Sequence, residues 1–249
     1  FPATGTLRRI LAANDQLFAI TAEFASDATT YSVYYFDGTS FQSTGISGND
    51  VIDAPDSVAY FGGAYWFTAG SNLVTGAASA LSVAEGPVTT ASFGGICSTG
   101  TGLIVSTSDG YLYHSTDGIA WTATSSQFTN SSSKIISLSA PSYIDDGTKK
   151  ILLVGTSKQP RSSSDTPPGD GYLDFNLTDG FDAAMSPTDD HALVSTATNF
   201  DASLSGKSVR AMPRFAMGGG TLKLFALTDG NGLWSNEFSS GAWGGWIRE

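Results

Sequence analysis

The chain has 249 residues, a net charge of −11 from 12 basic and 23 acidic residues, and a single cysteine, Cys97. One cysteine excludes an intramolecular disulfide scaffold, and the longest apolar stretches fall far short of the roughly 20 residues that a membrane-spanning helix needs. The acidic balance argues against a nucleic-acid partner, because affinity for phosphates comes from clustered lysine and arginine.

Five short apolar runs recur along the chain, and each ends at a threonine. They are rich in β-branched, aromatic and aliphatic side chains, which is typical of buried β-strands. In chain order the runs are Leu17–Thr21, Tyr65–Thr68, Leu103–Thr107, Leu152–Thr156 and Leu224–Thr228. They predict one buried strand in each of five repeats of about 50 residues.

Each run has a candidate strand before it, and a second strand with a tight turn after it. The preceding strands are Arg9–Ala12, Ser57–Tyr60, Gly95–Cys97, Ile135–Leu138 and Val209–Met212. The turns are Tyr35–Gly38, Val83–Gly86, Ser115–Gly118, Leu177–Gly180 and Phe238–Gly241. Asp-Gly and related pairs supply the positive φ of a tight hairpin. Each repeat therefore holds four antiparallel strands, which we label a to d, with the turn between c and d.

This repeat protein is predicted to be all-β, a β-propeller of five four-stranded blades in one domain over residues 1–249. A β-sandwich also contains many short strands, but it gives no reason for a turn signature to recur five times. The chain starts on an a strand and ends on a d strand at Trp246–Arg248. Closure of the ring is therefore expected to rest on packing between the first and fifth repeats.

The segment Tyr113–Trp121 resembles the Asp-box, or bacterial neuraminidase repeat (BNR), of sialidase-like propellers. The family pattern is Ser-x-Asp-x-Gly-x-x-Trp, and here Gly118 follows Asp117 directly, so the spacing to Trp121 is one residue shorter. Degenerate copies are Asp37-Gly38 with Phe41, Asp179-Gly180 with Phe181, and Gly241 with Trp243. The resemblance implies a structural role, and no catalysis, for Ser115, Asp117, Gly118 and Trp121.

The connections between strands indicate where a ligand would bind. In an up-and-down sheet the b-to-c and d-to-a connections lie at one end, which we call the loop face. The two longest irregular segments, 157–171 and 186–207, are connections of these two kinds, and long loops in compact domains often carry function. Arginines near the starts of a strands or in these loops suit a carboxylate, and aromatic rings suit sugars. The predicted ligand-binding residues are Arg8, Arg9, Arg161, Arg210, Tyr172, His191 and Phe200. The alternative is that the arginines pair with the plentiful aspartates.

We therefore expect a monomeric, non-catalytic binding module for a glycan or a protein partner. The low charged fraction of 14% and a start at Phe1 without methionine favour export, to the extracellular space, the cell surface or the periplasm. No cofactor or metal is expected, since His114 and His191 are the only histidines.

Two alternatives remain open. The first is a glycoside hydrolase with carboxylates in a central funnel, for which the candidates are Asp53, Asp56, Asp189 and Asp190. A sialidase itself is not favoured: the resemblance implies six blades and an arginine triad with tyrosine, glutamate and aspartate, whereas this chain has five repeats and four glutamates. The second alternative is a structural subunit of the cell surface.

Overall fold

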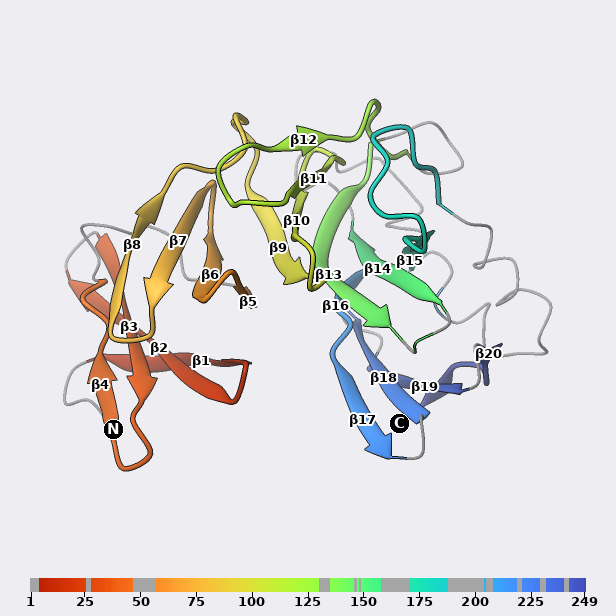
Figure 1. The fold of residues 1–249 in the computed structure, drawn as a ribbon. Helices are drawn as coiled ribbons and strands as arrows, with labels where there is room; N and C mark the ends of the chain where they lie inside the picture. The colour runs from red at the N-terminus through yellow and green to blue at the C-terminus, as the bar shows by residue number, and fades with distance from the viewer. Residues whose placement is uncertain are drawn as a thin grey trace. The chain divides into compact units, whose positions relative to one another are not determined.

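The computed structural model describes residues 5–25, 28–46, 57–129, 135–145, 147, 149–157, 171–187, 204, 208–218, 221–228, 232–239 and 242–249. Within these ranges every regular element is a β-strand. The strands form five antiparallel sheets that follow one another along the chain (Figure 1).

The first three sheets each run up and down through four consecutive strands. The first contains β1 (Thr6–Ala13), β2 (Gln16–Ala25), β3 (Ala28–Phe36) and β4 (Phe41–Ser43). The second contains β5 (Ser57–Phe61), β6 (Ala64–Ala69), β7 (Asn72–Ala77) and β8 (Ala80–Ala84). The third contains β9 (Phe93–Ser98), β10 (Leu103–Thr107), β11 (Leu112–Ser115) and β12 (Thr122–Ala123).

The last two sheets depart from this regular pattern. Among the described residues the fourth has three strands, β13 (Ser137–Asp145), β14 (Lys150–Ser157) and β15 (Tyr172–Asn176). The fifth has six, β16 (Val209–Ala211), β17 (Arg214–Gly218), β18 (Thr221–Thr228), β19 (Leu233–Ser239), β20 (Ala242–Trp243) and β21 (Ile247–Arg248). Both β16 and β17 pair with β18, and both β20 and β21 pair with β19, so the fifth sheet has four rows with the outer two broken. Pro213, which has no N–H to donate, lies in the first break.

The all-β fold and the five antiparallel blades of a β-propeller, predicted from the sequence, are confirmed. Every apolar run is the second strand of its sheet, namely β2, β6, β10, β14 and β18. One predicted turn is wrong: residues 83 and 84 belong to β8, and the turn between β7 and β8 is Ala78–Ser79. That turn contains neither glycine nor aspartate, so the turn signature could not find it.

Contacts divide the chain into an N-terminal unit, residues 1–104 and 115–121, and a C-terminal unit, residues 105–114 and 122–249. In the N-terminal unit a buried cluster joins the first two sheets. Phe18 lies at its centre and meets Phe67 edge to face, with ring centroids 4.9 Å apart and planes at 89°. The same ring meets Tyr65 at 5.0 Å. Every second residue of β2 and β6 thus contributes a side chain to this core.

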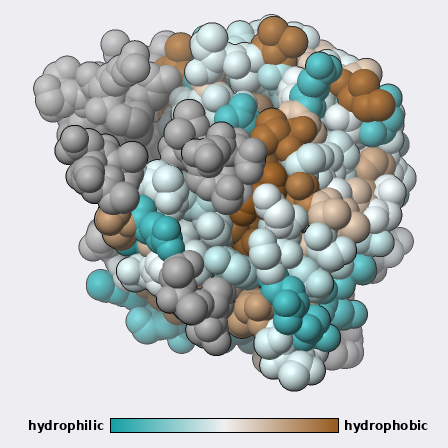
Figure 2. All heavy atoms as spheres, turned by 90° about the vertical axis from the view of Figure 1, so that its left-hand side faces the viewer, coloured by the Kyte–Doolittle hydropathy of each residue, from teal (hydrophilic) through white to brown (hydrophobic). Residues whose placement is uncertain are grey.

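The first sheet also carries large apolar side chains on its surface. Leu7, Ile10, Leu17 and Phe24 are 43%, 48%, 42% and 65% exposed. Figure 2 shows one face of the molecule, on which hydrophilic and weakly polar residues cover most of the described surface and hydrophobic residues gather near the centre. Phe24 is the most exposed of the four, and its surroundings are described below.

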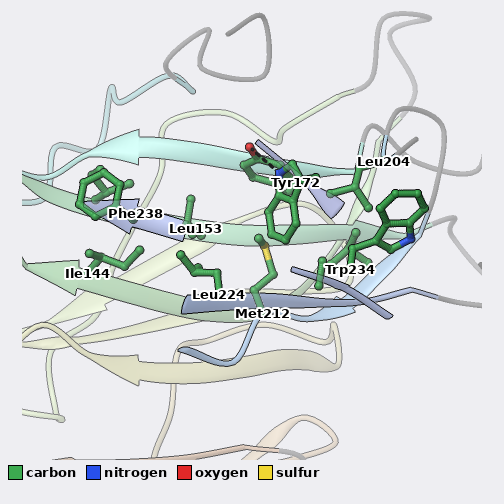
Figure 3. Packing of buried hydrophobic residues seen from close by; sticks show 12 residues of the cluster. Ile144, Leu153, Tyr172, Leu204, Met212, Leu224, Trp234 and Phe238 are labelled. Carbon is green, nitrogen blue, oxygen red and sulfur yellow. Dashed lines mark hydrogen bonds between the residues drawn. The ribbon is translucent and has the colours of Figure 1, made fainter. Parts of the chain in front are cut away.

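In the C-terminal unit, a cluster of twelve buried residues joins the fourth and fifth sheets. Figure 3 shows Leu153 and Tyr172 of the fourth sheet beside Leu224 and Trp234 of the fifth. All four of these side chains are at most 7% exposed. This core therefore fixes the starts of β15 and β16, where both long connections end.

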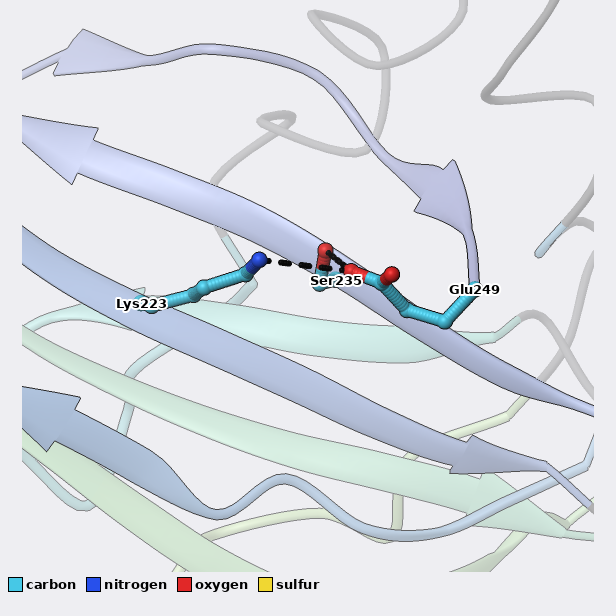
Figure 4. A network of polar contacts seen from close by, with 3 residues as sticks. All are labelled: Lys223, Ser235 and Glu249. Carbon is cyan, nitrogen blue, oxygen red and sulfur yellow. Dashed lines mark hydrogen bonds and ion pairs between the residues drawn. The ribbon is translucent and has the colours of Figure 1, made fainter.

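Polar contacts hold the chain end on the fifth sheet. The Glu249 carboxylate accepts a hydrogen bond from the Ser235 hydroxyl, and its Oε1 lies 3.3 Å from the Lys223 ammonium (Figure 4). These groups, the Ser235 bond first, lower the pKa of Glu249 below its ordinary value. The network is exposed enough that solvent screens it.

We propose that residues 1–249 form one domain, as the repeats predict. A single domain unfolds in one cooperative transition. We therefore expect calorimetry to give one peak with equal calorimetric and van't Hoff enthalpies. Two resolved transitions, one for each compact unit, would contradict the proposal.

Candidate ligand-binding site

Side chains of the Asp-Gly turn between β11 and β12 form hydrogen bonds with the backbone of the same turn. The Asp117 Oδ1 atom accepts backbone hydrogen bonds from Ile119 and Ala120, at 2.8 and 2.9 Å, and a bond from the Ser115 hydroxyl at 3.0 Å. In turn the Ser115 Oγ atom accepts the Gly118 amide at 2.8 Å. The amide bonds, that of Ile119 first, lower the pKa of Asp117. This carboxylate is thus engaged in holding the turn.

The turn between β3 and β4 repeats this geometry. The Asp37 Oδ1 atom accepts the amides of Thr39 and Ser40, both at 2.8 Å, and the Ser40 bond is the main cause of a lowered pKa for Asp37. Gly38 has a φ of 97° and Gly118 a φ of 77°. An aromatic residue follows each aspartate by four positions. The two turns are therefore similar in structure as well as in sequence.

The indole of Trp66 covers the Asp117 turn. A Cβ atom on Gly118 would overlap the Cη2 and Cζ2 atoms of this ring, which is 8% exposed. Trp121 is half-buried, and its ring N–H is buried without a hydrogen-bond partner. All these contacts are internal to the protein, which supports a structural role for the box residues; that role stays a prediction.

The ends of the long connections meet at the loop face of the C-terminal unit. Gly171, before β15, forms a parallel bridge with Ser208, before β16. The Thr156 amide donates to the Gly171 carbonyl at 2.9 Å. A Cβ atom on Gly171, whose φ is 84°, would lie 2.8 Å from the carbonyl oxygen of Leu204. The strand order predicted that both connections open at one end, and these contacts agree with it.

Seven of the residues predicted for binding or catalysis lie outside the described residues: Asp53, Asp56, Arg161, Asp189, Asp190, His191 and Phe200. Arg8 and Arg9 lie exposed on β1 of the N-terminal unit, and Arg210 lies exposed on β16 of the C-terminal unit. The predicted clustering of these arginines stays a prediction.

Tyr172 has a buried position at the start of β15. It is 4% exposed, and its ring meets that of Trp246 edge to face at 5.8 Å. Its hydroxyl accepts a hydrogen bond from the Trp246 indole at 3.4 Å. The ring therefore packs in the core of the C-terminal unit, which disfavours the predicted stacking of Tyr172 on a sugar.

The first sheet holds an aromatic residue that the sequence prediction missed. Phe24, near the end of β2, is 65% exposed, and the guanidinium carbon of Arg8 lies 5.7 Å from its ring centroid. The sequence prediction ended this apolar run at Thr21, whereas β2 continues to Ala25. The available signal was the alternation of Phe18, Ile20 and Ala22, which leads to Phe24 two residues later.

His114 and Phe181 form an aromatic pair in the C-terminal unit. The rings of His114 and Phe181 stack with centroids 4.9 Å apart and planes at 12°. Burial lowers the pKa of His114. In the described ranges there is no cluster of three or more His, Cys, Asp or Glu residues able to hold a metal ion. The same ranges contain no helix that could cross a membrane.

The fold defines the class of this molecule, a β-propeller protein with five antiparallel sheets. No protein-family model matches the sequence, and no curated protein matches it. Solved structures do resemble it. One is PorZ, an essential bacterial surface component of the type IX secretion system of Porphyromonas gingivalis, with a TM-score of 0.58 and 11% identity over 94% of this chain.

Two further structures resemble the chain. The extracellular domain of BT4673 from B. thetaiotaomicron has a TM-score of 0.51 and 16% identity over 98% of this chain. The dihydro-heme d1 dehydrogenase NirN has a TM-score of 0.51 and 11% identity over all of it. The chain spans 33% of PorZ, 28% of BT4673 and 47% of NirN. Because a surface component and a dehydrogenase share this fold, the likeness shows the fold alone.

Proposed function

We propose that this protein is a non-catalytic binding module outside the cell, which recognises a glycan or a protein partner through the loop face of its blades. The observation that carries the proposal is Arg8. Its side chain is exposed at the loop face of the first sheet and lies over an exposed aromatic ring. Within the described ranges no ion pair joins Arg8 to an acidic side chain.

Two further observations support the proposal. The matching Asp37 and Asp117 turns support membership of the Asp-box, sialidase-like propellers. A bacterial surface component and an extracellular domain are among the solved structures of similar fold, which supports an exterior location. We propose a monomer without metal or cofactor. The acids named for a glycosidase lie outside the described residues, so no structural observation favours that alternative.

A glycan array and a capture experiment with the intact protein test the proposal. We expect saturable binding to a glycan or a protein, and no turnover of aryl glycosides. If no glycan binds and no partner is captured, the proposal of a binding module is wrong. Turnover that Asp53→Asn or Asp189→Asn abolishes would establish the glycosidase instead.

A further inference from the structure

The strand β17 lies at the edge of the fifth sheet. Among the described strands it pairs with β18 alone, and its residues from Arg214 to Met217 are all exposed (Figure 1). Two of them are large apolar side chains, Phe215 at 56% and Met217 at 60% exposed. Natural proteins usually cover an edge strand or place charges along it, because a free edge pairs readily with another chain. On β17 the only charged side chain is that of Arg214.

The register of β17 shows which of its backbone groups face the free edge. The Phe225 N–H donates to the Pro213 carbonyl at 2.9 Å, and Arg214 lies opposite Leu224. In an antiparallel pair of strands, hydrogen-bonded and non-hydrogen-bonded residue pairs alternate, so Arg214 and Ala216 both belong to the second kind. Their N–H and C=O groups therefore point away from β18. In the described part of the chain, no backbone hydrogen bond from another segment reaches these groups.

The charge of the fifth sheet differs in sign from that of the whole chain. The chain has a net charge of −11, whereas strands β16 to β21 carry four basic residues and one acidic residue, namely Arg210, Arg214, Lys223 and Arg248 against Glu237. Glu249, which follows β21, is paired with Lys223. Within the described ranges no ion pair joins Arg214 to an acidic side chain. Charge complementarity therefore favours an acidic partner at this edge over a second copy of this acidic chain.

We infer that β17 binds an extended, acidic peptide segment of a protein partner by β-strand addition. The segment would run antiparallel to β17 and exchange backbone hydrogen bonds with Arg214 and Ala216. A carboxylate opposite Arg214 would bind the guanidinium, and an apolar side chain opposite Phe215 would cover that ring. This site goes beyond the proposed function, because β17 lies at the a-to-b end of the fifth sheet, where Gly218 pairs with Thr221, and not at the loop face.

The peptide Thr-Val-Thr-Val-Glu-Thr, blocked at both ends, tests this site. In antiparallel register its third residue lies opposite Ala216 and its glutamate opposite Arg214. Amide hydrogen exchange of the intact protein is measured by NMR without the peptide and at saturation. We expect the Arg214 and Ala216 amides to exchange freely in the unbound protein and to slow by about tenfold or more in the complex. The Phe215 amide, which faces β18, should change little.

Matched changes remove one element of the contact at a time. N-methylation of the third peptide residue deletes a donor from the peptide, and Ala216→Pro deletes the N–H that faces the free edge. Each should weaken binding by about tenfold. Proline is tolerated at this position of an edge strand, so the melting temperature of Ala216→Pro should stay close to that of the wild type. Arg214→Gln should weaken binding by about threefold, whereas Arg8→Gln, on β1, should leave it unchanged.

The outcomes separate this site from its alternatives. If the peptide leaves the exchange of the Arg214 and Ala216 amides unchanged, or if the N-methylated and unmodified peptides bind the wild type equally, the proposal is overturned. Protection of the same two amides that rises with protein concentration, in the absence of peptide, would assign the edge to a second copy of this chain instead. None of these results bears on the loop face, which the glycan array and the capture experiment test.

Discussion

Replacement of Gly118 by alanine is expected to destabilise the protein by about 3 kcal/mol or more, whereas the same change at Gly38 should cost about 1 to 2 kcal/mol. Both glycines have positive φ, at 77° and 97°, so both variants lose the conformational freedom of glycine. At Gly38 no atom lies within 4 Å of the added Cβ. At Gly118 the added Cβ overlaps the indole of Trp66. The difference between the variants therefore measures that overlap.

Urea unfolding of both variants gives the two free-energy changes. In a Trp66→Leu background the cost of Gly118→Ala should fall to the value at Gly38, because the overlapping ring atoms are gone. Equal losses at Gly38 and Gly118 in the wild-type background would mean that the Trp66 ring moves aside without cost, and would contradict the prediction.

Truncation of Trp246 to alanine should cost about 3 to 5 kcal/mol, the range for large buried aromatic residues. Its side chain is 1% exposed and packs between the fourth and fifth sheets against Tyr172. The matched variant Tyr172→Phe keeps the ring and loses only a hydroxyl that accepts a 3.4 Å hydrogen bond, so we expect about 1 kcal/mol there.

Chemical denaturation monitored by far-UV circular dichroism measures both effects. A loss below about 1 kcal/mol for Trp246→Ala would place that ring outside the core and contradict the prediction. Unchanged ligand binding in Tyr172→Ala, if that variant folds, would show in addition that Tyr172 is a packing residue only.

The sequence predicted the second strands well because each is a short, mostly apolar run, and in β10 the side chains are buried on both faces of the sheet. Ile104 and Val105, consecutive in β10, are both 0% exposed. Some strands and turns without such a pattern were missed, although the mostly exposed β1 was predicted. β17 follows Pro213 and exposes Phe215 and Met217, so nothing in its sequence marks it as part of a sheet.

The candidate site was predicted less completely than the fold. Arginine is rare in this chain, so Arg8 could be singled out from composition and strand position. Alternation along β2 could have placed its neighbour Phe24 in the strand, but it predicts a buried side chain there, whereas Phe24 is 65% exposed. The strand register also shifts at Arg8, and the hydrophobic pattern of β1 does not show this bulge because Arg8 and Arg9 are both charged and exposed.

The two aspartate turns also bear on how the chain folds. Each satisfies its amides with a carboxylate two or three residues away, and Asp117 also binds Ser115 two residues before it. Contacts so close in sequence form without the entropy loss of closing a long loop. The β3–β4 and β11–β12 hairpins can therefore form before their sheets assemble, and they give the growing structure two fixed points of strand register.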